Sequence, residues 1–219
     1  MTVAPFLARC HWLQDDLAAI DDGCVWRLGG VVLARSGNAV AVIRKAARPG
    51  YDFSRLWALP GGMARQRADG EETTLSRSIS ERASKEIGLR LGPIVPRADL
   101  GPIVTEYSSR GAPRRTLITV FESVLVPPMG ALQPGDASIE DATWLDFPPK
   151  PAIFAPANRL ILGHLVWPRL SEDLRLDWRV QLETALTHCA EAAIGADVAS
   201  PPAPWDSQQE IDAWRQAWP

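Results

Sequence analysis

The fold is decided by Leu59-Pro60-Gly61-Gly62, followed about twenty residues later by Glu81-Arg82-Ala83-Ser84-Lys85-Glu86-Ile87-Gly88-Leu89. A proline before two glycines predicts a sharp bend, because glycine adopts backbone conformations that other residues avoid. Apolar residues then recur every fourth position, which predicts a helix over residues 73–87 with one buried stripe: Leu75, Ile79, Ala83 and Ile87. Gly88 is a helix stop. The sequence therefore predicts a glycine bend followed by an amphipathic helix.

Segments rich in β-branched residues lie on both sides of this unit. Val25 to Ala34 and Ala39 to Lys45 are separated by Arg35-Ser36-Gly37-Asn38, a turn-forming sequence, and predict a hairpin. Further strands are predicted over residues 57–59, 99–107, 116–126 and 141–145. The central part of the chain is therefore β-rich around a single helix.

This order of elements, with the Leu-Pro-Gly-Gly bend before the helix, resembles the Nudix superfamily. The Nudix box runs G-x5-E-x7-R-E-U-x-E-E-x-G-U, where U is a bulky apolar residue, and Glu86-Ile87-Gly88-Leu89 matches its end. The segments Arg115 to Glu122 and Glu140 to Trp144 also resemble later strands of the family. The resemblance runs from roughly Val25 to Phe147, and it implies an α/β/α sandwich with a mixed sheet.

The resemblance also implies a chemistry. Nudix enzymes hydrolyse a nucleoside diphosphate linked to another group, by attack of water on a phosphoanhydride with Mg²⁺ or Mn²⁺ as cofactor. The implied catalytic residues are Glu86 and, as general base, Glu140 or its neighbour Asp141. Gly61 and Gly62 would let a backbone carbonyl approach a ligand or metal closely. The implied ligand is a nucleotide or another small phosphorylated molecule.

The box departs from the family pattern at its charged positions. Glu81 stands where the family has arginine, and Arg82 and Lys85 stand where it has glutamates, so Glu86 alone keeps a family metal-binding position. Gly62 is followed by eight residues before Glu71, where the family has five, and Glu71 by nine before Glu81, where it has seven. The loop therefore carries insertions.

Three interpretations of this altered helix face remain open. In the first, it is a solvated surface on which Glu81 pairs with Lys85 and Arg82 with Glu86, each pair contributing about 0.2–0.5 kcal/mol. In the second, Arg82 and Lys85 replace the charge of the metal and bind a phosphate group directly. In the third, Glu86 belongs to a rewired metal site completed by carboxylates from elsewhere in the chain.

The third interpretation draws on four carboxylates outside the helix: Glu71, Glu72, Glu122 and Glu140. Glu71 and Glu72 lie beside the start of the helix, where acidic residues also favour the helix dipole without any catalytic role. Glu122 is predicted to share one side of a strand with Ile118 and Val120. It is therefore either a paired, partly buried carboxylate or a residue of the site.

The composition excludes some classes of protein. The chain has 219 residues, 46% of them hydrophobic and 22% charged, and a net charge of -3, which gives no electrostatic reason to expect a nucleic acid polymer as partner. Its start lacks the pattern of a signal peptide, and no apolar run approaches the ~20 residues of a membrane span. Three widely spaced cysteines indicate neither a zinc knuckle nor a disulfide framework. We therefore expect a cytoplasmic protein that does not bind membranes.

Flanking segments extend the chain on both sides of the Nudix-like part. We expect an N-terminal helical extension over 1–24, the Nudix-like domain over 25–150, C-terminal helices over 151–194, a linker over 195–206 and a docking helix over 207–219. Two C-terminal helices are predicted, with a break at Pro168. The C-terminal region is rich in tryptophan and would cover the domain, form the subunit contact of a homodimer, or bind another protein as a scaffold.

Overall fold

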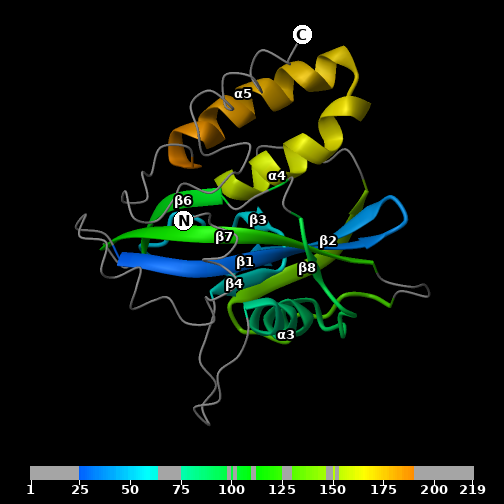
Figure 1. Cartoon of the computed structure of the whole chain (residues 1–219). Helices are drawn as coiled ribbons and strands as arrows, with labels where there is room; N and C mark the ends of the chain where they lie inside the picture. The colour runs from blue at the N-terminus through cyan, green and yellow to red at the C-terminus, as the bar shows by residue number, and fades with distance from the viewer. Residues whose placement is uncertain are drawn as a thin grey trace.

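A computed structural model describes residues 25–63, 75–97, 100, 103–109, 112–124, 130–146, 150 and 153–189 of the chain. The predicted N-terminal helix, the residues Glu71 and Glu72, the linker and the terminal docking helix lie outside these ranges. Within them, the protein is a mixed β-sheet covered by helices on both faces (Figure 1). The predicted α/β sandwich is confirmed.

The described part of the sheet has eight strands. They are β1 (Val25–Ser36), β2 (Ala39–Lys45), β3 (Trp57–Ala58), β4 (Gly61–Met63), β5 (Val95–Pro96), β6 (Ile103–Ser109), β7 (Ala112–Val124) and β8 (Ile139–Asp146). The main path runs β3-β2-β1-β7-β5, while β4 pairs with β1, β6 with β7 and β8 with β2. The β1–β7 ladder is parallel, and the other ladders are antiparallel.

The predicted hairpin is confirmed as β1 and β2, with Gly37 in the turn at φ 55°. The short strand β3 is confirmed as well, but the bend after it continues into β4, a strand that the sequence did not predict. Gly61 and Gly62 pair in β4 with Val31 and Gly30 of β1. Glycine weakens a strand in isolation, so the pairing of β4 depends on the long neighbouring strand and not on its own composition.

Helix α3 (Leu75–Ile87) covers one face of the sheet and confirms the predicted amphipathic helix (Figure 1). Its four stripe residues are buried, and they pack against alternate sheet residues such as Val32 and Ala34 of β1. Gly88 follows at φ 69°, which confirms the predicted stop. Main-chain N–H groups of Gln133 and Gly135 donate to the carbonyls of Ile87 and Lys85, so the segment 130–138 closes the end of the helix.

The opposite face is covered by α4 (Pro156–Val166) and α5 (Glu172–Cys189), which lie above the sheet in Figure 1. The predicted break at Pro168 falls in a short 3-10 helix, η2 (Trp167–Arg169), between them. Val31 and Leu33 of β1 share a hydrophobic core with α4 and α5, in which Trp178 is fully buried. The two C-terminal helices are therefore a layer of the sandwich.

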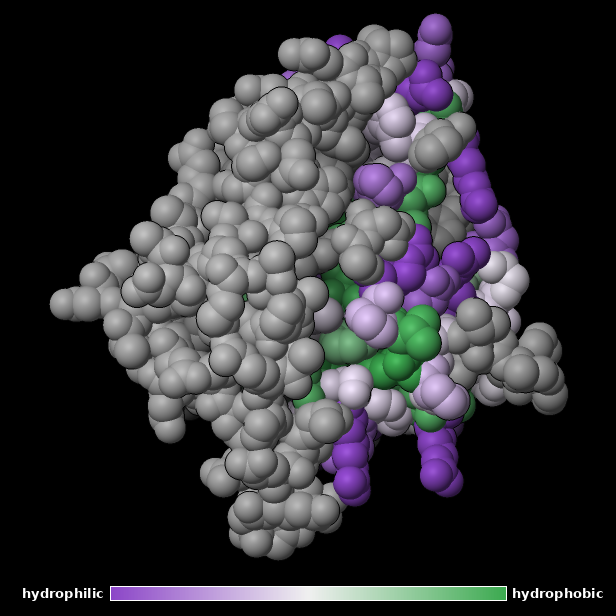
Figure 2. Space-filling view, in the orientation of Figure 1, coloured by the Kyte–Doolittle hydropathy of each residue, from purple (hydrophilic) through white to green (hydrophobic). Residues whose placement is uncertain are grey.

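The described surface carries a few exposed large hydrophobic residues: Val95, Ile153, Leu174, Leu176 and Val180. Figure 2 shows that hydrophobic and hydrophilic side chains lie next to one another on the described part of one face. None of the helices in the described part of the chain is long and apolar enough to cross a membrane.

Candidate ligand-binding site

The glycine bend is shaped by a close approach between two strands. Gly61 has φ 144°, and a Cβ placed there would lie 2.8 Å from the Cα of Val31. Only glycine fits this position without moving β1. The bend thereby brings the main-chain N–H of Gly61 to the inner side of α3.

A buried side chain from the opposite layer holds the residue before the bend. The main-chain N–H of Leu59 donates to Oδ1 of Asn158, at the start of α4, over 2.8 Å. Asn158 is itself buried. This hydrogen bond satisfies a buried donor that would otherwise have no strand partner, and it ties the bend to α4.

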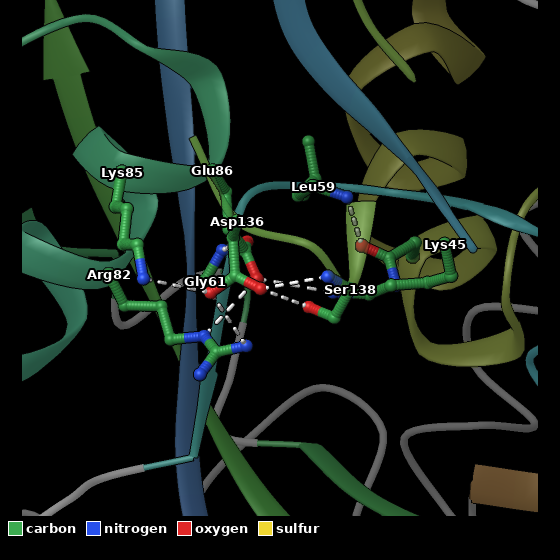
Figure 3. Close-up of polar contacts among 9 residues, drawn as sticks. Lys45, Leu59, Gly61, Arg82, Lys85, Glu86, Asp136 and Ser138 are labelled. Carbon is green, nitrogen blue, oxygen red and sulfur yellow. Dashed lines mark hydrogen bonds and ion pairs between the residues drawn. The ribbon is translucent and has the colours of Figure 1, made fainter. Parts of the chain in front are cut away.

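Glu86 is the buried centre of the site (Figure 3). Its Oε2 accepts a hydrogen bond of 2.8 Å from the N–H of Gly61. Its Oε1 accepts from Nε of Arg82 at 3.2 Å and from Nζ of Lys45 at 3.4 Å. The Glu86 side chain is 0% exposed, whereas Arg82 and Lys45 keep 18% and 19% of their side-chain surface in solvent. One buried negative charge is therefore compensated by two cations that still reach the surface.

A second carboxylate, Asp136, lies close to Arg82 and to a third cation, Lys85. Its Oδ2 is 3.9 Å from Arg82 and 3.6 Å from Nζ of Lys85, and both side chains project from α3 toward it (Figure 3). Its Oδ1 accepts hydrogen bonds from the main chain and the hydroxyl of Ser138, at 2.9 and 2.7 Å. These hydrogen bonds, together with Arg82 and Lys85, outweigh burial and lower the pKa of Asp136 to about 2.

An open cleft of about 560 Å³ is lined by Lys45, Arg82 and Asp136, and it lies between the loop after β2, the glycine bend and the segment 136–138. Lys45, Arg48 and Arg82 give the cleft a cationic wall, and Asp136 is the carboxylate that lines it. Tyr51 lies at its edge, stacked edge-on against Phe53 with ring centroids 5.6 Å apart. The cleft thus joins a positively charged wall to an aromatic edge.

A smaller apolar cavity of about 100 Å³ adjoins this cleft on the α4 side. The two share five lining residues: Lys45, Tyr51, Gly61, Gly62 and Met63. Asn158 contributes polar atoms to the otherwise largely apolar wall of the cavity. A ligand that spans both would meet cations at one end and apolar surface at the other.

The structure brings some of the predicted site residues together. Arg82 and Glu86 lie against Gly62 and Gly61, and Arg82 pairs with Glu86 as predicted. The predicted pair of Glu81 with Lys85 is replaced by other contacts, since Glu81 binds Arg77 at 3.0 Å and Lys85 reaches Asp136. The helix face is thus only partly the solvated surface of the first interpretation, because Glu86 is buried.

Glu122 lies apart from this group. It accepts hydrogen bonds from Arg35 and Arg97. In β7 it lies on the same face as Ile118 and Val120, which pack in the core under α4 and α5. The paired, partly buried carboxylate was one of the two predicted alternatives, and this position does not bring Glu122 to Glu86 on the α3 face.

The other predicted carboxylates are also not gathered around Glu86. Glu140 and Asp141 lie 3.6 and 3.7 Å from Arg44, whose guanidinium group lies over the ring of Trp57. Trp57 packs against the core of the α4 side, so this pair occupies the other face of the sheet from Lys45 and Glu86. Glu71 lies outside the described residues.

The divalent ion implied by the resemblance does not fit the described side chains. Mg²⁺ takes hard oxygen ligands, usually from carboxylates and phosphates. Both oxygens of Glu86 already accept hydrogen bonds, and two cations lie within 3.4 Å of one of them. Among the residues that the structure describes, no three His, Cys, Asp or Glu side chains are placed to hold a metal ion.

Several residues of the cleft were not predicted. Lys45 ends β2, and Arg48 and Tyr51 lie in the loop after it, with no sequence spacing that links them to Arg82 or Glu86. Asp136-Ala137-Ser138 has the form of a local Asx-turn, in which an aspartate binds the main chain two residues on. That signal predicts a turn, but it does not predict that the turn packs against α3.

The comparisons with known proteins give a similarity of structure only. No protein-family model matches the sequence, and no curated protein matches it at a significant level. Among solved structures, the chain is similar to a MutT Nudix hydrolase from Burkholderia pseudomallei, at 16% identity and a TM-score of 0.46 over 63% of this chain and 96% of that one. It is likewise similar to a MutT protein from Methanosarcina mazei Go1, at 14% identity and a TM-score of 0.46 over 67% and 96% of the two chains.

A third similar structure is the Nudix domain of Shewanella oneidensis NrtR in complex with ADP ribose, at 19% identity and a TM-score of 0.41 over 67% and 84% of the chains. The solved structures similar to this chain thus include Nudix hydrolases. What the cleft is able to bind follows from its own side chains.

Proposed function

We propose that the cleft binds the phosphate group of a small phosphorylated molecule, and in particular a nucleotide, directly through cationic side chains and without a divalent ion. The observation that carries this proposal is the buried Glu86 carboxylate, which Lys45, Arg82 and the N–H of Gly61 already compensate. A metal ion at this carboxylate would lie against two positive charges. A phosphate group in the cleft would instead be attracted by the same two positive charges.

The hydrogen-bonding capacity of the wall supports this proposal. Arginine has five N–H donors and lysine three, and Arg82 and Lys45 each use one on Glu86. Arg48 lines the same wall from the loop after β2. Charge-assisted hydrogen bonds from such groups to phosphate oxygens are short and about twice as strong as neutral ones. The wall is therefore suited to an anion with several oxygen acceptors.

The aromatic edge supports a nucleotide as the ligand class. Tyr51 lines both the cleft and the apolar cavity, and the guanidinium group of Arg48 lies 5.9 Å from the centre of its ring. Planar groups stack on aromatic rings, and apolar pockets with few polar groups fix the orientation of a ligand. A base or sugar beside Tyr51 would leave its phosphates near Lys45 and Arg82.

The test is thermal stabilisation of the full chain in EDTA by ADP, ADP-ribose and pyrophosphate, with adenosine as the ligand that lacks phosphate. We expect stabilisation by the three phosphorylated compounds and none by adenosine at equal concentration. Arg82→Gln should reduce the stabilisation, because glutamine keeps a polar side chain next to Glu86 but removes the charge. Arg77→Gln is the matched control, since Arg77 lies exposed on the same helix with Glu81.

A turnover assay with the same compounds separates this proposal from hydrolysis. Cleavage that requires Mg²⁺ or Mn²⁺ would overturn metal-independent binding as the function and favour the rewired metal site. The absence of both stabilisation and cleavage would overturn both, and would favour a scaffold that acts through the tryptophan-rich C-terminal region.

A further inference from the structure

Asp136 places a negative charge inside a cleft whose other charged wall is positive. Its carboxylate lies within 4 Å of both Arg82 and Lys85, where the oxygens of a bound phosphate would be expected to lie. It is 17% exposed, and it lines the cleft together with Ala137 and Ser138. The carboxylate of Asp136 is thus a negative charge of the protein itself, placed beside Arg82, which lines the cleft, and beside the more exposed Lys85.

This carboxylate is held in place from its other oxygen. Both the N–H and the hydroxyl of Ser138 donate to Oδ1, while Oδ2 points to the cations. The segment that carries Asp136 is anchored in turn, because Gly135 donates to the carbonyl of Lys85 and Gln133 to that of Ile87. The negative charge is therefore fixed over the end of α3 by several hydrogen bonds.

Protonation does not remove this charge under ordinary conditions. The pKa of Asp136 is lowered to about 2, so the carboxylate stays ionised at any pH at which a nucleotide is normally bound. A phosphate that enters the cleft has to compete with the Asp136 carboxylate for Arg82 and Lys85, or it is repelled by Oδ2 of Asp136. Both effects oppose a ligand in proportion to its negative charge.

We propose that Asp136 is a specificity-determining residue that competes with ligand phosphate for Arg82 and Lys85, and so weakens the binding of highly charged phosphate compounds. This inference rests on the proposed function of the same cleft. It assigns Asp136 a role opposite to that of a residue that positions Arg82 for binding. The two roles predict opposite effects of one substitution.

The test is the binding of pyrophosphate in EDTA by calorimetry, compared between the wild-type chain and Asp136→Asn. Asparagine keeps an oxygen that accepts the hydrogen bonds of Ser138, so the turn is preserved while the charge is removed. We expect pyrophosphate to bind about tenfold more tightly or better, as the loss of one like charge at short range implies. Phosphate monoesters, which carry less negative charge than pyrophosphate, should gain less.

Asp146→Asn is the matched control, because it removes the same charge from an exposed position at the far end of β8, opposite Ala39. Its affinity for pyrophosphate should stay near that of the wild-type chain. A second measurement uses Lys85→Ala in both backgrounds. Lys85 should contribute little to binding while Asp136 is present and more in Asp136→Asn, so the two changes should not be additive.

The outcomes separate this inference from the proposed function. Tighter binding by Asp136→Asn, with a larger effect of Lys85→Ala in that background, supports the competition. Equal or weaker binding by Asp136→Asn, when the wild-type chain does bind pyrophosphate, overturns the competition and leaves the proposed function intact. If neither chain binds pyrophosphate although ADP binds, the competition is overturned; if neither chain binds any of the phosphorylated compounds, the proposed function fails and the inference fails with it.

Discussion

Replacing Glu86 with glutamine removes the buried negative charge at the centre of the site and changes its shape very little. Glutamine still offers an oxygen to the N–H of Gly61, which lies 2.8 Å from Oε2 of the native side chain. Lys45 and Arg82, however, lose the carboxylate that holds them at 3.4 and 3.2 Å. The substitution therefore isolates the electrostatic part of the interaction.

The expected loss of stability follows from the burial of the three groups. Breaking a fully buried ion pair costs about 3–5 kcal/mol, because it leaves the partner charge uncompensated. Here the remaining cations keep 18% and 19% of their side-chain surface in solvent and are able to turn toward water. We therefore expect a smaller loss than this range, about 2–3 kcal/mol, which lowers the melting temperature by about 5–10 °C for a chain of this size.

The assay is thermal and urea unfolding of Glu86→Gln beside Glu81→Gln. Glu81 lies on the same helix but is 54% exposed and pairs only with Arg77 among the contacts described, so its substitution should cost about 0.2–0.5 kcal/mol. Pyrophosphate in EDTA should still stabilise Glu86→Gln, because its cations no longer share a carboxylate. Equal stability of the two variants would refute the view that Glu86 is a buried, charge-compensated residue that stabilises the fold. Loss of pyrophosphate binding by Glu86→Gln would refute the view that the cationic wall binds phosphate.

Three further predictions concern other contacts of the site. Asn158→Ala leaves the buried N–H of Leu59 without its acceptor and should lower the free energy of unfolding by about 1–3 kcal/mol, measured in urea. Gly88→Ala places a Cβ against the carbonyl of Gln133 at a positive φ, and should cost about 1–2 kcal/mol or more by the same measurement. Asp136 stabilises the fold above its unfolded pKa near 3.8, and this contribution is lost as the pH falls toward about 2. Unfolding measured from pH 5 to pH 2 should therefore depend less steeply on pH in Asp136→Asn, and an unchanged slope would contradict this assignment.

The amphipathic helix and the hairpin were predictable because their signals are local. The stripe of Leu75, Ile79, Ala83 and Ile87 repeats with the period of a helix, and each of these residues is buried. The turn between β1 and β2 places Gly37 at a positive φ, a conformation that glycine favours. Patterns of this kind depend on residues a few positions apart, so they can be recognised without knowledge of the rest of the chain.

The strand β4 and the full extent of β7 were not predictable in the same way. The sequence of Gly61 and Gly62 predicts a bend, but these residues form a strand because they pair with the main chain of β1. β7 begins at Ala112, four residues before the predicted start, where it runs parallel to β1 from the pair Val25 and Arg114 onward. Pairing partners distant in sequence decide where a strand begins and ends.

The sequence by itself determined the charges along this helix, because Arg82, Lys85 and Glu86 are visible in the order of residues alone. Only the tertiary structure decided what surrounds Glu86. Lys45 comes from 41 positions earlier in the chain and the N–H of Gly61 from 25, while Asp136 reaches Arg82 and Lys85 from a later loop. The energy of a charge depends on its burial and on its neighbours in space, and neither is encoded in the spacing of one short motif.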